Sequence, residues 1–409
     1  MKQQTQTQEA GDKHNIETAW VAYSSEGILF DVGSLCAHFS RLIDGRKARG
    51  KRYTLVTMLL LMTLAKLCGE DTPEAIADWA RERGEALAGM LKLKRSAMPH
   101  ATTYGRVLRK AVLPETFERE MLAYFAQQPD VLNAHQRCID GKQVRGTELV
   151  AGEGNVYLLG VYVPGTGVML MQVELATGEG ELTVAPHVLR ALDLQGKVVT
   201  GDAAFTQRSL SLQIVEAGGD YVWKVKDNQP SLLAAITLLF APPTPALPGF
   251  STPKSDFRTC RETTCGHGRI ETRTLTTSSL LQDSSDWPHL AQVFQLTCER
   301  TNKKTGETTR TNTYGVTSQS AAQAGPSTLL RQVRAHWGIE GASHQRRDVT
   351  FHEDFCDLRR GHSAHLMAIL NNLAIALITR AGFANAAHAR RVFAARPQDA
   401  LMLLTTAPP

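Results

Sequence analysis

The spacing of hydrophobic positions predicts that the first third of the chain is helical. The run 54–68 is apolar almost throughout and predicts a buried helix, because it is too short to span a bilayer and contains Lys66. The pattern over 72–93 predicts a second helix, with Thr72 as its N-cap and Pro73 at its first position. This part of the chain is therefore expected to form a small helical domain.

Basic residues change the picture of this helical region. A turn and a short basic helix over 98–112 resemble a helix-turn-helix layout, which leaves two interpretations open: DNA binding or a solvated basic face. The stretch 45–53 carries five cations in nine residues and no acid, which also favours an anionic partner. These cations are Arg46, Lys47, Arg49, Lys51 and Arg52.

From about residue 135 the pattern changes to short strands alternating with helices. The segment 155–175 reads as two strands joined by Pro-Gly-Thr-Gly, which is typical of a hairpin. The elements expected after it are a helix over 182–194, a strand over 197–203, a helix over 207–218 and a strand over 220–227. Three opening strands followed by alternating helices and strands indicate an α/β fold, a mixed sheet with helices packed on both faces.

A Thr- and Ser-rich stretch over 233–320 interrupts this alternation and is patterned as strands, so an inserted β-rich block is expected there. The chain becomes helical again from about residue 326. The predicted domains are a leader over 1–27, a helical and DNA-binding domain over 28–130, a catalytic domain over 131–390 and a tail over 391–409.

Composition narrows the class of protein. The chain has 409 residues, 43% of them hydrophobic, which is enough for two or three domains with a core. The net charge of +5 permits an anionic partner without requiring one. Seven scattered cysteines do not resemble a disulfide framework, and the polar N-terminus lacks the apolar core of a signal peptide. A reduced, cytoplasmic protein without a membrane partner is expected.

Three acidic residues stand out by position. Asp140 follows a short apolar strand, and Asp202 closes the strand 197–203, where ligands gather in open α/β sheets. For Asp140 alone, a surface turn is the competing interpretation. Glu340 lies in HWGIEGASHQRRDVTFHEDF, where His336, Glu340, His344 and Arg347 recur at helical spacing and are expected to line one face. That stripe is either a solvated helix face or a catalytic carboxylate among basic neighbours.

Several ordered motifs connect these acids to a known family. They are IDGKQVRG around Asp140, VVTGDAAFTQ around Asp202, VKDNQPSL at 225–232, GHGRIETR at 266–273, and HWGIE with DVTFHED near Glu340. With these motifs the chain resembles bacterial insertion-sequence transposases of the DDE class, specifically the H-repeat-associated (ISAs-type) group. The resemblance covers about residues 30 to 380 and implies a ribonuclease-H-like fold with a β-rich insertion between the second Asp and the Glu.

The resemblance also implies an activity and its residues. Asp140, Asp202 and Glu340 would hold two Mg²⁺ or Mn²⁺ ions for DNA cleavage and strand transfer. The partners implied are double-stranded DNA, as element terminal inverted repeats and target, and a second copy of the chain in a homodimer on DNA. Besides the five cations of 45–53, the residues expected to contact DNA are Lys142, Arg145, Lys226, Asn228, His267, Arg269, His336 and Arg347.

The segment after Glu340 departs from the group, since GASHQRR replaces the expected Asn and Leu-His-Trp stretch. A degenerate or co-opted transposase that binds DNA without catalysis is therefore the alternative. A zinc site formed by Cys260, Cys265 and His267 is a further alternative, although no fourth ligand is evident. A metal stripe of His336, Glu340 and His344 is disfavoured, because Arg347 would oppose a cation.

Overall fold

The computed structural model describes residues 21–23, 28–49, 51–145, 147, 155–242, 256–266, 268–356, 358 and 360–408. The chain divides into two compact units. Unit 1 consists of residues 1–133, 141–178 and 340–409, and unit 2 of residues 134–140 and 179–339. Each unit is described by itself below.

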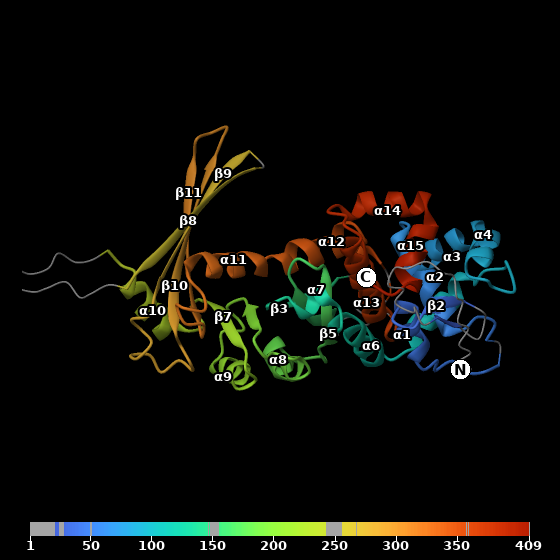
Figure 1. Ribbon diagram of the computed structural model, residues 1–409, viewed down its shortest axis with the longest axis horizontal. Helices are drawn as coiled ribbons and strands as arrows, with labels where there is room; N and C mark the ends of the chain where they lie inside the picture. The colour runs from blue at the N-terminus through green and yellow to red at the C-terminus, as the bar shows by residue number, and fades with distance from the viewer. Residues whose placement is uncertain are drawn as a thin grey trace, which may run out of the picture. The chain divides into compact units, whose positions relative to one another are not determined.

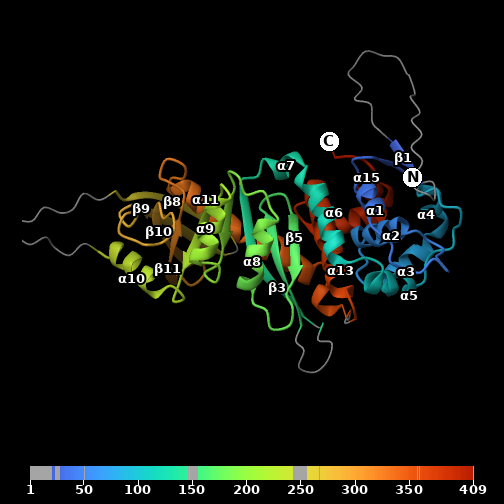
Figure 2. The same ribbon diagram turned by 90° about the horizontal axis from the view of Figure 1, so that it is seen from below.

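Helices make up most of unit 1, and α13 is its central element (Figures 1 and 2). It contacts α2, α5, α6, α14 and the strand β5, and 89% of it is buried, so its length and hydropathy reflect a core helix. The helices of unit 1 are α1 (Leu35–Arg41), α2 (Leu55–Leu67), α3 (Pro73–Glu82), α4 (Gly84–Met90), α5 (Ala101–Lys110), α6 (Pro114–Ala126), α7 (Pro129–Leu132), α12 (Gln345–Val349), α13 (Ser363–Arg380), α14 (Ala386–Ala395) and α15 (Pro397–Thr405). A small hairpin, β1 (Val21–Tyr23) with β2 (Leu29–Asp31), precedes them.

Local sequence signals explain where the first helices begin. Thr54 caps α2, and its hydroxyl accepts from the backbone N–H of Thr57 at 3.2 Å. Thr72 caps α3 by accepting from Ala75 N at 3.1 Å, with Pro73 in the first turn. The cap at Thr72 confirms the sequence-based expectation.

The single helix expected over 72–93 is wrong, because the chain breaks at Arg83 into α3 and α4. Gly84 opens α4, and a Cβ there would lie 2.4 Å from the backbone oxygen of Ser96. The break at Arg83 therefore depends on a close approach of the backbone at Gly84 to the backbone at Ser96. The helical periodicity of the sequence does not predict such a contact.

The strands form a mixed nine-stranded sheet in the order β5-β4-β3-β6-β7-β11-β10-β9-β8. The first five in this order, read along the chain as third, second, first, fourth and fifth, have the strand order of a ribonuclease-H-like sheet, which confirms the predicted fold class. The strands are β3 (Gln136–Val144), β4 (Val156–Val163), β5 (Val168–Glu174), β6 (Val198–Gly201), β7 (Asp220–Val225), β8 (Arg258–Gly266), β9 (Arg269–Ser278), β10 (Gln292–Asn302) and β11 (Thr308–Thr317).

Helices cover both faces of the sheet in unit 2. On β7, Val222 packs in a core cluster with Val333 of α11 (Pro326–His336). The next residue, Trp223, donates from its indole N–H to Ser211 of α9 (Arg208–Glu216) at 3.0 Å. Successive side chains of a strand point to opposite faces, so α11 lies on one face and α9 on the other (Figure 1).

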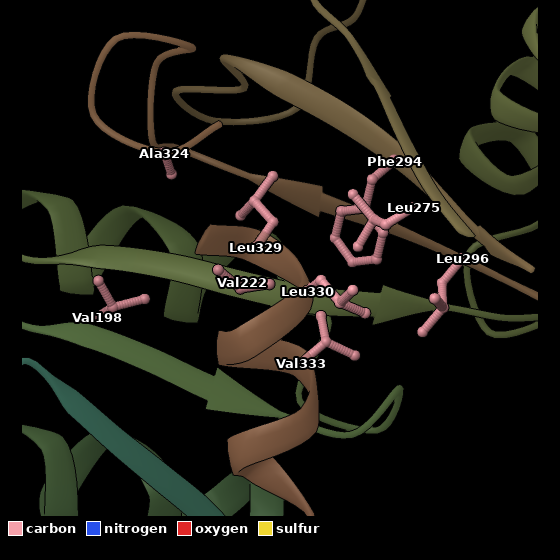
Figure 3. Close-up of a cluster of buried hydrophobic side chains, with 9 residues drawn as sticks. All are labelled: Val198, Val222, Leu275, Phe294, Leu296, Ala324, Leu329, Leu330 and Val333. Atoms are coloured by element: carbon pink, nitrogen blue, oxygen red, sulfur yellow. The ribbon is translucent and has the colours of Figure 1, made fainter. Parts of the chain in front are cut away.

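The α11 face of unit 2 contains a hydrophobic core that joins the central strands to the later ones. Figure 3 shows α11 packed on this face. The cluster comprises Val198, Val222, Leu275, Phe294, Leu296, Ala324, Leu329, Leu330 and Val333. Because its members come from β6, β7, β9, β10, α11 and the segment just before α11, the core fixes α11 against the sheet.

The stretch expected to form an inserted β-rich block provides four antiparallel strands, β8 to β11, that extend the main sheet through pairing of β11 with β7. Its first part is helical, since α10 spans Pro230–Leu239. The first helix of the alternating region, α8, spans Glu181–Arg190.

The tail expected over 391–409 is also wrong, because α14 and α15 occupy most of it and pack on α1 and α2.

Candidate carboxylate site

Asp140 and Asp202 are brought together by strand register. The parallel strands β3 and β6 pair with Gln136 opposite Val198 and Cys138 opposite Thr200. Continuing this register places Asp140 opposite Asp202. Both side chains are half-buried, and Oδ1 of Asp202 accepts from the backbone N–H of Ala204 at 2.8 Å.

Both aspartates project from the sheet face that α11 covers. Two residues before them, Cys138 Sγ lies 3.9 Å from the backbone oxygen of Ala335, and Thr200 Oγ1 lies 3.2 Å from Nδ1 of His336. Because side chains alternate along a strand, Asp140 and Asp202 follow on the same face. Asp140 lies within β3, so the interpretation as a surface turn is wrong.

Lys224 continues this line on the third strand. Parallel pairing of β6 with β7 places Gly201 opposite Trp223, so the next residues, Asp202 and Lys224, are neighbours. The ammonium group of Lys224 lies 5.6 Å from the ring centre of Trp337, the residue that follows α11. We call Asp140, Asp202 and Lys224 the site row.

Glu340 is exposed and belongs to unit 1, whereas the site row belongs to unit 2. It lies in a π-helical turn, Ile339–His344, between α11 and α12. Turns of this kind are frequent at functional sites.

The π-helical turn changes the helical phase that the sequence pattern assumed. Glu340 is exposed, whereas His336 and Arg347 are 2% and 1% exposed, so the expectation of one common face is wrong.

His336 cannot act as the cation that was expected to grip a phosphate. Its ring is buried against Thr200, and burial together with the charge of Lys224 lowers its pKa to about 3. A neutral imidazole in this position orders the end of α11 instead.

Arg347 is likewise unable to reach DNA in this structure, because Glu353 holds it inside unit 1. Its Nε and Nη2 atoms donate to the Glu353 carboxylate at 2.6–2.9 Å, and Nη1 donates to Oε1 of Gln172 at 3.3 Å. Asn371 donates to the same carboxylate at 2.8 Å. Burial alone would raise the pKa of Glu353, but Arg347 and Asn371 hold it below its ordinary value.

The other cations expected to contact DNA differ in accessibility. Lys142 is buried and pairs with Asp348 at 2.5 Å, which argues against a phosphate contact. Arg46 is half-buried and pairs with Asp44 at 2.8 Å, and Asp44 also lies 3.2 Å from Lys51. Exposed side chains are those of Lys47, Arg49, Lys51, Arg52, Arg145, Lys226, Asn228 and Arg269.

Asn228 and Arg269 are exposed but also have partners nearby. The Asn228 amide donates to the backbone oxygen of Ala203 at 2.7 Å, one residue after Asp202, so it supports the turn that follows β6. Arg269 pairs with Glu271 at 2.7 Å. His267 lies outside the described residues, and the zinc alternative is left with Cys260 and Cys265 on the single strand β8.

The side chains that could bind a metal ion form an incomplete set of ligands. Within either unit, the described residues contain no group of three or more His, Cys, Asp or Glu side chains that could hold a metal ion. The Asp140–Asp202 pair nevertheless supplies neighbouring carboxylate oxygens, the ligand type that Mg²⁺ and Mn²⁺ prefer. The pair therefore has the chemistry to supply two of the ligands that a divalent metal ion requires.

Comparison of the sequence with known protein families identifies the family of this chain. Residues 135–377 match the family described as Transposase DDE domain, and residues 36–125 match the family described as DDE_Tnp_1-associated. The first match alone covers more than half of the chain. The chain belongs to the DDE transposase family.

Relatives of this DDE transposase chain carry names that agree with this assignment. A protein named "H repeat-associated putative transposase YhhI" from Escherichia coli K12 is 25% identical over 362 residues, which are 85% of this chain and 91% of the relative. A protein named "Putative transposase YncI" from Escherichia coli O157:H7 is 27% identical over 354 residues, covering 85% and 87%.

Among solved structures, this DDE transposase chain is similar to a chain in the cryo-EM structure of the piggyBac transposase synaptic complex with hairpin DNA. The TM-score is 0.39 and the identity 12%, and the alignment covers 91% of this chain and 77% of the other.

Sequence reasoning missed Lys224 and Trp337 as members of this region. Trp337 is 39% exposed. Lys224 lies two positions after the buried Val222 on β7, the strand that pairs with β6. With that strand pairing assumed, this spacing would have predicted that Lys224 lies next to Asp202.

Proposed function

We propose that the chain catalyses metal-dependent DNA cleavage and strand transfer at the ends of an insertion sequence. The observation that supports this most directly is the register of the parallel strands β3 and β6, which places Asp140 opposite Asp202 when it is continued by two residues, within the part of the chain that matches the DDE domain. Neighbouring carboxylates on one sheet face suit phosphoryl transfer, because they can hold divalent cations against a phosphate.

Asp140 and Asp202 would form one side of the site, and Glu340 would complete it as the third carboxylate. Two Mg²⁺ or Mn²⁺ ions, when bound, would supply charge neutralisation at the reacting phosphate and activation of water. The water oxygen forms a bond to phosphorus at the element end while the bond to the 3′ oxygen breaks. The departing oxygen takes up the proton that the attacking water loses, which leaves a 3′-hydroxyl. This hydroxyl then attacks a phosphate of the target DNA; the bond between that phosphate and its own 3′ oxygen breaks, and the released oxygen takes up the proton of the attacking hydroxyl.

Double-stranded DNA is the proposed partner, in the form of the element ends and the target. The exposed cations Lys47, Arg49, Arg52, Arg145 and Lys226 are candidates for phosphate contacts, which supply most of the sequence-independent affinity for DNA. A homodimer on DNA is proposed as well, since two element ends must be joined.

The decisive experiment incubates purified protein with oligonucleotides copied from the DNA that flanks the gene, in Mg²⁺ or Mn²⁺. We expect cut and joined strands from the native chain and none from Asp202→Asn or Glu340→Gln. Matched controls are Asp283→Asn and Glu307→Gln, which change exposed acids outside the site and should keep the products.

The same experiment distinguishes catalysis from the second candidate function, DNA binding without catalysis. DNA binding without products in either metal would overturn the catalytic proposal and leave a DNA-binding protein, which the altered segment 341–347 favours. Loss of products in Asp202→Asn but not in Glu340→Gln would remove Glu340 from the site.

A further inference from the structure

The strand β8 forms one edge of the nine-stranded sheet. It is the last strand in the sheet order, and it pairs with β9 from Arg258 opposite Thr277 to Gly266 opposite Arg269. Among the residues that the structure describes, no further strand pairs with its other side. One row of backbone N–H and C=O groups along β8 therefore remains open, and such a row is a template for an additional strand.

This edge lacks the bulge and the proline that often prevent pairing with another chain. All nine residues of β8 pair with β9 without a register shift, and none of them is a proline. None of its side chains is buried, and exposed and half-buried positions alternate over residues 259–265. The strand is therefore regular and accessible enough to accept a partner strand along its open side.

The charges of β8 favour a second copy of the same strand. Arg258, Cys260 and Glu262 share the face that α11 covers, since Cys260 packs against the core cluster there and Glu262 accepts from Arg334 of α11 at 2.5 Å. A second β8, antiparallel and related by a two-fold axis at Cys260, places Arg258 of each copy opposite Glu262 of the other. Opposite charges across a strand pair are stabilising.

The neighbouring symmetric registers lack this match. A two-fold axis at Arg261 or at Glu262 would place that residue opposite its own copy, and like charges directly opposite each other are destabilising. The charge pattern therefore selects the register centred on Cys260. An extended segment of another protein would use the same backbone groups but would not be specified by this pattern.

We propose that two copies of the chain associate by antiparallel pairing of their β8 strands, centred on Cys260. The interface is isologous, so each copy contributes the same residues, and the two sheets become one continuous sheet. This inference rests on the proposed function only in that the joining of two element ends requires two copies. It involves neither DNA nor metal, so it is testable separately from cleavage.

Cross-linking of the full chain tests the register directly. Opposite side chains of antiparallel strands have Cβ atoms about 4.5–5.5 Å apart, close enough for a disulfide after a small adjustment. Mild oxidation with copper–phenanthroline, without DNA, should therefore link two native chains through Cys260, and Cys260→Ser should abolish the linked dimer. Cys265→Ser is the matched control, because it removes a more exposed thiol of the same strand and should leave the dimer unchanged.

Charge exchange tests the interface without a cross-link. In sedimentation measurements, Arg258→Glu or Glu262→Arg alone should weaken dimerisation about tenfold or more, because each places like charges opposite each other twice. An equal mixture of the two variants should recover the dimer, since the introduced charges then face opposite partners. Arg310→Glu, which changes an exposed arginine of β11, is the control and should leave the native dimer unchanged.

Cross-linking through Cys265 instead of Cys260, or a mixture that dimerises no better than either variant alone, would overturn this interface. A native chain that is monomeric but cleaves DNA would also overturn it and leave the cleavage proposal intact. A dimer that responds to these variants as expected but gives no strand cleavage in metal would support the interface and count against catalysis.

Discussion

Two basic residues near Glu340, His336 and Arg347, have buried side chains. Arg347 and His336 match the helical spacing of a DNA-facing stripe, yet each is enclosed by partners that lie far away in the sequence. A guanidinium that is removed from water needs a paired carboxylate, and Glu353 supplies it. These residues therefore stabilise the segments on either side of Glu340.

Removal of one partner of the Arg347–Glu353 pair should be costly. We expect Glu353→Gln or Arg347→Met to lower the free energy of unfolding by about 3–5 kcal/mol, because each leaves a buried charge unpaired. Guanidinium denaturation would measure the change. The control is Asp78→Asn, which breaks the exposed pair with Arg81 and should cost at most about 1 kcal/mol. Equal losses in the two sets would contradict the burial of the pair.

Titration of His365 should make the stability of unit 1 depend on alkaline pH. Burial alone would lower its pKa, but the carboxylates of Glu118 and Glu174, at 3.5 and 3.3 Å, outweigh it and raise the pKa to about 9. The folded-state pKa exceeds the unfolded value near 6.5. Stabilisation is therefore complete below about pH 6.5 and is lost as pH rises to about 9.

Thermal unfolding followed from pH 6 to pH 10 should show this decline in the native chain, and His365→Gln should flatten it. His135→Gln, which changes an exposed ring, should leave the slope as it is. If the melting temperature of the native chain did not decline between pH 6 and pH 10, the ion pairs of His365 with Glu118 and Glu174 would not stabilise unit 1.

At acidic pH, stability should be lost through protonation of His336. Its folded-state pKa of about 3 lies below the unfolded value, so the stability present above about pH 6.5 is lost as pH falls towards 3. Denaturation midpoints measured between pH 7 and pH 4 should decline less in His336→Asn than in the native chain. An equal decline would show that other groups dominate.

At the scale of elements, the sequence predicted the helix and strand features that depend on residues close together in the chain. The cap at Thr72, the strand that carries Asp140 and the strand that Asp202 follows were predicted from local patterns, and all are present. The π-helical turn at Glu340 and the break at Arg83 depend on contacts made after the chain folds, so periodicity could not reveal them. The same limit hid Lys224, whose place is set by strand pairing.

Two glycines should respond in opposite ways to alanine. Gly315 of β11 faces Phe294, and a Cβ there would lie 2.5 Å from the backbone oxygen of Trp223, which cannot move aside. Gly315→Ala should cost about 3 kcal/mol through overpacking. Gly341 has no atom within 4 Å of the added carbon, so Gly341→Ala should stabilise by about 0.5–1 kcal/mol. Urea denaturation would compare both, and a large loss in Gly341→Ala would show that the π-helical turn requires glycine.

At the scale of the whole molecule, unit 1 is assembled from the beginning, the middle and the end of the chain. The last segment closes it, because Arg390 of α14 donates to Asp71 at 2.7 Å and to the backbone oxygen of Lys66 at 3.1 Å. The helix α2, almost entirely buried, contacts α13, α14 and α15.

A chain that ends at residue 381 should therefore lose cooperative unfolding of unit 1. We expect it to bind the dye ANS and to unfold at a lower temperature, because apolar surface of α2 becomes exposed. Removal of residues 408–409, beyond α15, is the control and should have no such effect. Native-like melting of the shorter chain would show that the two last helices are dispensable.

The division of unit 1 among distant segments also has a consequence for protein synthesis. The apolar helix α2 leaves the ribosome long before the helices that cover it, and at 5–20 residues per second the delay is on the order of tens of seconds. During that interval the nascent chain exposes a surface that chaperones recognise. A gene copy interrupted near its 3′ end would then yield a polypeptide destined for proteolysis, so truncation of the coding sequence should remove the protein before a defective form accumulates.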